Sequence, residues 1–88
     1  MKKSGYYILA FDSTHHAIKA EEQLKKNKVE AEMIPTPREV DASCGLSVKI
    51  PERCLERARV LIDMPAGRVK LYSVGTNRGR TVYVEQEM

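Results

Sequence analysis

Two cysteines and two histidines are the residue types in this 88-residue chain best suited to chemistry. Cys44 is followed by Gly45 in a polar stretch, and His15 and His16 are adjacent in another. A thiolate is a strong nucleophile, and a cationic or basic neighbour lowers the pKa of a thiol and relays its proton. We therefore take Cys44 as the reactive thiol and His15, His16 and Arg38 as its candidate catalytic partners.

The second cysteine, Cys54, falls on the apolar side of a predicted helix, which favours a packing role. Its spacing from Cys44 is neither C-x-x-C nor a zinc pattern. His15, His16 and Cys44 could in principle ligate a metal, but this spacing is a weak signal, and no metal site is predicted. The chain has no phosphate-binding glycine loop, H-E-x-x-H motif or nucleophile elbow, so no cofactor is expected.

Hydrophobic periodicity predicts the elements that position these residues. The expected elements are a strand over Tyr6 to Phe11, a helix over Thr14 to Lys26 that Asn27 ends, strands over Ala31 to Ile34 and Leu46 to Ile50, a helix from Pro51 that Pro65 and Gly67 end, and a strand over Val69 to Val74. Gly75 to Arg80 is expected to be a loop, and Thr81 to Glu85 could add a short fifth strand.

This β-α-β-β-α-β order is that of the ferredoxin-like split βαβ arrangement. We expect an α+β two-layer sandwich, in which two helices cover one face of an antiparallel sheet. Another two-layer α+β order is the main alternative. A chain of this length is one domain, over residues 1 to 88.

The predicted topology brings distant residues to one edge of the sheet. The first strand lies antiparallel beside the third, so the start of the first helix lies near the start of the third strand. Cys44 would then lie under the N-terminus of that helix, where backbone N–H groups and the helix dipole stabilise a thiolate. Residues expected to bind a ligand at this edge are Ser13, Thr14, Thr36, Pro37 and Gly45.

Each of these features also has a purely structural interpretation. Cys44 could pack as a small hydrophobe, and composition alone does not decide between this and a nucleophile. The two histidines could lie in a solvated first helical turn. Pro35 and Pro37 could simply end an edge strand and prevent further pairing.

Composition excludes several classes of protein. A net charge of +3, from 15 basic and 12 acidic residues, is too mild for a typical nucleic-acid footprint, so nucleic acid is not an expected partner. No apolar run approaches the roughly 20 residues that a membrane helix needs. We therefore expect a cytoplasmic protein with no membrane association. A homodimer that buries the open face of the sheet is one further expectation.

Three blocks of the chain resemble the putative Se/S carrier-like family of short bacterial domains. The blocks are Ser13-Thr14-His15-His16-Ala17, Ile34-Pro35-Thr36-Pro37-Arg38-Glu39 and Ser43-Cys44-Gly45-Leu46. The resemblance covers roughly Tyr6 to Val74. Such proteins are associated with selenium or sulfur metabolism, so the resemblance implies that Cys44 is the carrier thiol.

The leading hypothesis is a carrier rather than an enzyme. It would hold sulfur or selenium on Cys44 as a persulfide or selenopersulfide, receiving the atom from a donor protein and passing it to an acceptor protein. The alternative is a non-catalytic ferredoxin-like module that binds a small ligand or a protein, with Cys44 as a packing residue. A thiol enzyme or redox sensor is a third interpretation.

Overall fold

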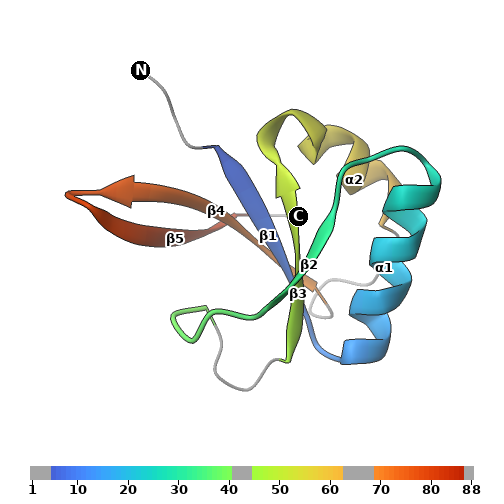
Figure 1. Cartoon of the computed structure of the whole chain (residues 1–88), viewed down its shortest axis with the longest axis horizontal. Helices are drawn as coiled ribbons and strands as arrows, with labels where there is room; N and C mark the ends of the chain where they lie inside the picture. Colours follow the sequence, from blue (N-terminus) through green and yellow to red (C-terminus); the bar gives the residue numbers. More distant parts are fainter. Residues whose placement is uncertain (1–4, 41–44, 63–68, 87–88) are drawn as a thin grey trace.

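The computed structural model describes residues 5–40, 45–62 and 69–86 (Figure 1). Within these residues the chain forms five strands, two α-helices and one short 3₁₀ helix. In chain order they are β1 (Tyr6–Phe11), α1 (Thr14–Lys26), β2 (Glu32–Pro35), β3 (Leu46–Pro51), the 3₁₀ helix η1 (Glu52–Cys54), α2 (Leu55–Leu61), β4 (Val69–Asn77) and β5 (Arg80–Gln86).

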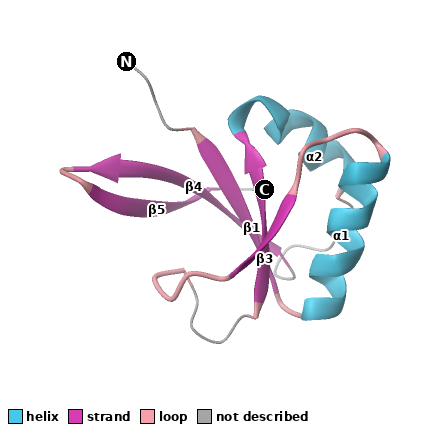
Figure 2. Cartoon of the chain, in the orientation of Figure 1, coloured by secondary structure: helices cyan, strands magenta, loops and turns pink. Residues whose placement is uncertain are grey.

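The strands form one antiparallel sheet in the order β2-β3-β1-β4-β5. The central strand β1 pairs with β3 on one side and with β4 on the other, so Tyr6 faces both Pro51 and Val74. Both helices lie on the same side of the sheet (Figure 2). The predicted α+β class, antiparallel pairing and helix-covered face are confirmed, and the described sheet has five strands rather than the four of a β-α-β-β-α-β unit.

The core lies between the helices and one face of the sheet. Alternate residues of β1 point to this face, and Leu9 and Phe11 are each 1% exposed there. They pack with Leu24 of α1 and Ala58 of α2 in one buried cluster. Full burial of a large apolar side chain stabilises a fold by about 1.5–3 kcal/mol, so this cluster holds the two layers together.

Helix α1 is capped at both ends. The hydroxyl of Ser13 accepts a hydrogen bond from the N–H of His16 at 3.2 Å, which satisfies a donor of the first turn. At the other end Lys28 has a φ of 62°, and the N–H of Val29 donates to the carbonyl of Leu24 at 2.9 Å. This pattern is a Schellman motif, whose left-handed position favours glycine.

A Lys28→Gly variant is expected to be more stable than the wild type by about 0.5–1 kcal/mol, because glycine removes the strain of a left-handed side-chain-bearing residue. The matched control is Lys19→Gly at an exposed site inside α1, which is expected to lose about 1 kcal/mol. Urea unfolding of the three proteins measures both differences. Equal losses in the two variants would contradict the expected effect.

The predicted loop over Gly75 to Arg80 is wrong. Strand β4 continues to Asn77, which pairs with Arg80 at the start of β5. The chain reverses through Arg78 and Gly79 alone, whose φ angles are 56° and 79°. Two successive positive φ angles are the signature of a type I′ turn. Arg78 carries no sequence signal for this conformation, which is why the pattern suggested a longer loop.

The second helix also differs from its predicted bounds. Pro51 ends β3, and the chain then makes the single turn of η1 before α2 begins at Leu55. Helix α2 ends at Leu61, with Ile62 as its C-cap. Pro65 and Gly67, the residues expected to end this helix, lie outside the described residues.

Candidate functional site

Three segments that are distant in the sequence meet at one edge of the sheet. A Cβ atom built on Gly45, just before β3, would lie 3.3 Å from Oγ1 of Thr14, the first residue of α1. The carbonyl of Gly45 accepts a hydrogen bond from the N–H of Thr36 at 3.3 Å. The structure therefore brings Thr14, Thr36 and Gly45 together, where β2 ends and where α1 and β3 begin (Figure 1).

A partly buried side-chain hydrogen bond links this edge to β3. The hydroxyls of Thr36 and Ser47 lie 2.6 Å apart, and Ser47 is 0% exposed. Ser47 faces Ala10 across the β1–β3 pair, so it lies on the sheet face opposite the helices. Sequence reasoning missed Ser47, because a serine in an alternating strand usually indicates a solvated face.

A Thr36→Val variant is expected to destabilise the protein by about 1–3 kcal/mol, because it leaves the buried hydroxyl of Ser47 without this partner. In a Thr36→Val/Ser47→Ala double variant both ends of the bond are gone, so we expect less loss than the sum of the single variants. Urea unfolding of the four proteins completes the cycle. Strictly additive losses of unfolding free energy would show that the two hydroxyls do not stabilise each other.

His16 is oriented by two partners from the N-terminal turn of α1. Its Nδ1 lies 2.8 Å from Oδ1 of Asp12 and 3.1 Å from Oγ of Ser13. An ionised carboxylate only accepts hydrogen bonds, so Nδ1 carries the proton that donates to Asp12. The lone pair of the neutral ring then resides on Nε2, which is the atom that can accept a proton from another group.

His15 is exposed, and its ring centroid lies 5.9 Å from that of His16. The rings are tilted at 53° to each other. Within the described part of the chain no hydrogen bond fixes the His15 ring. The predicted histidine pair therefore consists of one oriented ring, that of His16, and one solvated ring.

Pro37 and Arg38 belong to a turn that follows β2. The N–H of Val40 donates to the carbonyl of Pro37 at 2.9 Å, which closes the turn, and Arg38 is exposed within it. Counting only described residues, Arg38 forms no hydrogen bond or ion pair with His15 or His16. The structure thus places Arg38 on the same connection as Thr36, and leaves its guanidinium available to solvent.

The turn lies within electrostatic reach of the open face of the sheet. Burial raises the pKa of Tyr83 above its ordinary value of 10.0, and the charges of Tyr6 and Glu39 raise it further. Tyr83 pairs with Val74, which pairs with Tyr6, so both tyrosines lie on the face opposite the helices. Glu39, next to Arg38, is therefore close enough to Tyr83 to raise its pKa.

Of the two cysteines, the structure describes only Cys54. Cys44 lies outside the described residues, as do residues 41–43 before it. Cys54 is half-buried and packs against the core cluster, in agreement with the packing role expected for it. No group of three or more His, Cys, Asp or Glu side chains positioned to hold a metal ion occurs among residues 5–40, 45–62 and 69–86.

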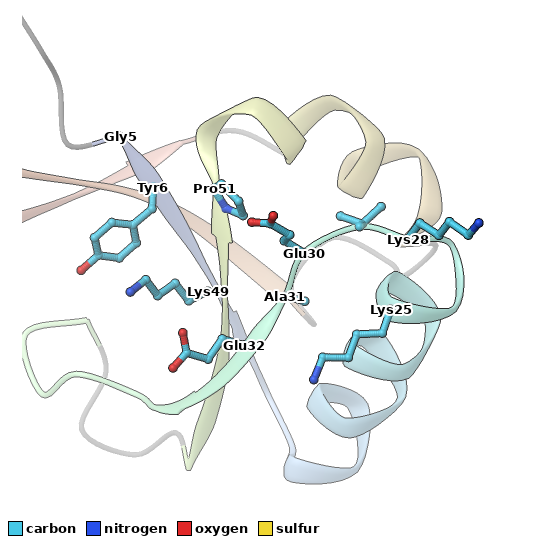
Figure 3. Close-up of a pocket in the computed structure, with 10 residues that line it drawn as sticks. Gly5, Tyr6, Lys25, Lys28, Glu30, Ala31, Glu32, Lys49 and Pro51 are labelled. Atoms are coloured by element: carbon cyan, nitrogen blue, oxygen red, sulfur yellow. The ribbon is translucent and has the colours of Figure 1, made fainter.

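A groove of about 630 Å³ lies at the other end of the sheet (Figure 3). Tyr6 and Pro51, the first residue of β1 and the last of β3, line it together with Lys25 near the end of α1. The ammonium of Lys49 lies 4.5 Å from the ring centroid of Tyr6 in a cation–π contact. Because this groove is at the opposite ends of β1, α1 and β3, it is separate from the edge that carries Thr14 and Gly45.

None of the described helices is long and apolar enough to cross a membrane. A family model described as "Putative Se/S carrier protein-like" matches residues 6–64, about two thirds of the chain. The match begins at the expected residue and ends ten residues before the expected Val74, so β4 and β5 lie beyond it. No curated protein and no solved structure matched the chain. The family match shows that the chain belongs to this Se/S carrier-like family.

Proposed function

We propose that this member of the Se/S carrier-like family holds a sulfur or selenium atom on Cys44 as a persulfide or selenopersulfide and delivers it to a partner protein. The family description supports the carrier role, and a carrier implies partner proteins that load and unload it. We also infer that the fold is the ferredoxin-like arrangement with β5 added, because the first four strands and the two α-helices follow its β-α-β-β-α-β order.

The contact between Gly45 and Thr14 is the observation that carries the proposal. Gly45 directly follows Cys44 in the chain, and it approaches the first residue of α1. The first turn of an α-helix has N–H groups without intrahelical partners and the positive end of the helix dipole. A thiolate or persulfide anion next to Gly45 would be stabilised there, and its thiol pKa would fall.

The loading step is a thiolate exchange that needs no separate oxidant. The thiolate of Cys44 attacks the outer sulfur of a persulfide on the donor, the donor S–S bond breaks, and a new S–S bond forms on Cys44. The donor leaves as a thiolate. Delivery repeats the step in reverse, with a thiolate of the acceptor as the nucleophile. A selenopersulfide transfers selenium by the same exchange.

Three residues near this edge have roles in this proposal. Nε2 of His16, whose ring Asp12 and Ser13 orient, accepts the proton of the Cys44 thiol and generates the thiolate. His15, which is exposed, adds a second base in the same turn. Arg38, exposed on the connection after Thr36, pairs with an acidic surface of the partner protein.

The proposal is tested by incubating the protein with inorganic polysulfide without oxygen and weighing the intact protein. We expect a gain of about 32 mass units, one sulfur atom, which peptide mapping assigns to Cys44. We also expect Cys44 to be alkylated quickly below about pH 7.5, as an activated thiol is. If Cys44 reacted slowly and gained no sulfur, the carrier hypothesis would be rejected. The alternative, a module that binds a small ligand or a protein, would then be favoured.

A further inference from the structure

The outer edge of β5 is a long, regular edge of the sheet. β5 is the last strand in the sheet order, so only β4 pairs with it among the described residues. It contains seven residues, RTVYVEQ, with no proline and no glycine. Thr, Val and Tyr favour extended backbone, so this edge is built as a template for a further strand.

The register of the hairpin identifies which backbone groups face outward. In a hairpin with a two-residue turn, the closing pair, here Asn77 and Arg80, exchanges hydrogen bonds. Alternate residues from Arg80 onward therefore bond to β4. The residues between them, Thr81, Tyr83 and Glu85, direct their N–H and C=O groups to the outer edge.

Within residues 5–40, 45–62 and 69–86, the opposite edge of the sheet has two protective features that this edge lacks. β2 has four residues and ends at Pro35. Short length and proline are two devices by which natural edge strands avoid pairing, whereas β5 has seven residues and no proline. β5 instead exposes two valines next to its free edge, Val82 at 36% and Val84 at 50%. Exposed β-branched side chains beside unpaired backbone indicate an edge that meets another strand.

We propose that β5 pairs antiparallel with β5 of a second copy of this chain, centred on Tyr83, so that the two sheets join into one. A two-fold axis through Tyr83 aligns all seven residues of each strand with no overhang. Thr81 then faces Glu85 of the second copy and Tyr83 faces its equivalent. These are the outward-directed residues, so the pairing satisfies their backbone donors and acceptors.

The side chains are self-complementary in this register. Val82 faces Val84 of the second copy, and the same pair recurs across the axis. These are non-hydrogen-bonded positions, where side chains of neighbouring strands lie closest. Arg80 faces the neutral Gln86, and Glu85 faces the neutral Thr81, so no like charges stand opposite each other. The surface therefore fits a second copy without any change in the hairpin.

Association is measured by sedimentation equilibrium of the full chain over a range of concentrations. We expect the wild type to show a monomer–dimer equilibrium, and Val84→Lys to raise the dissociation constant at least about tenfold, because a lysine at an edge opposes pairing. The matched control is Val60→Lys, at a site on α2 that is 82% exposed, which is expected to leave the constant unchanged. A wild type that stays monomeric up to roughly 1 mM would overturn the proposal.

Cysteine cross-linking tests the register in a background with Cys44→Ser and Cys54→Ser. Tyr83→Cys places two thiols across the axis with Cα atoms about 5.5 Å apart, which a disulfide can bridge, so we expect a covalent dimer on mild oxidation. Thr81→Cys separates the thiols by roughly 13 Å along the strands, beyond disulfide reach, so we expect none. Equal cross-linking of both variants, or of Thr81→Cys alone, would reject this register. Neither measurement depends on sulfur loading of Cys44.

Discussion

A Cys44→Ser variant is expected to gain no sulfur from polysulfide, whereas the wild type gains one atom. A serine hydroxyl is neither ionised near neutral pH nor able to form an S–S bond, so the exchange has no nucleophile at this position. The loss of loading should be complete, because the carrier proposal uses one thiol. Intact-mass measurement on the two proteins, treated in parallel, gives the result directly.

The matched control for this experiment is Cys54→Ala. Cys54 packs against the core from η1, and its removal leaves the edge with Gly45 and Thr14 in place. We expect this variant to load as the wild type does, although with some loss of stability from the smaller side chain. If loading survived Cys44→Ser and disappeared in Cys54→Ala, Cys54 would be the carrier thiol and the proposal would be overturned.

A Phe11→Ala variant is expected to lose about 3–5 kcal/mol of unfolding free energy. Phe11 is 1% exposed and is the last residue of β1, directly before Asp12 and the cap of α1. Its removal leaves a cavity where the first strand passes into the first helix. A domain of 88 residues has a total stability of roughly 4–13 kcal/mol, so the loss is a large share of the whole.

Urea unfolding measures this loss against a Val60→Ala control. Val60 is 82% exposed on α2, so its truncation should change stability by less than about 0.5 kcal/mol. If both variants unfolded at the same urea concentration, Phe11 would not be a core residue in solution. The same Phe11→Ala protein should also load sulfur poorly, because the turn that carries Ser13 and His16 begins at this residue.

The first strand and first helix could be predicted from the sequence because their signals are local. The apolar run from Tyr6 and the cap at Ser13 define β1 and α1, and the observed bounds coincide with the predicted ones. The turn at Arg78 could not be predicted in this way. Its backbone conformation follows from the strands that it joins, and an arginine there gives no indication of a positive φ.

In the candidate site, too, some features could be predicted from the sequence and others could not. Topology alone predicted that the starts of α1 and β3 meet, and Thr14 does contact the position of Gly45. The hydrogen bond between Thr36 and the buried Ser47 could not be predicted, because it depends on which groups cover the open face. The orientation of His16 by Asp12 likewise depends on side-chain conformation rather than on spacing. The role of Cys44 stays a prediction.

The position of β1 in the centre of the sheet has a consequence for biosynthesis. β1 leaves the ribosome before the other described elements, but its partner β4 follows about 60 residues later. Its apolar residues therefore remain without their final neighbours until nearly the whole domain has been synthesised. We expect the sheet to form only after β4 has left the ribosome, and the nascent chain to depend until then on chaperones that shield exposed apolar segments.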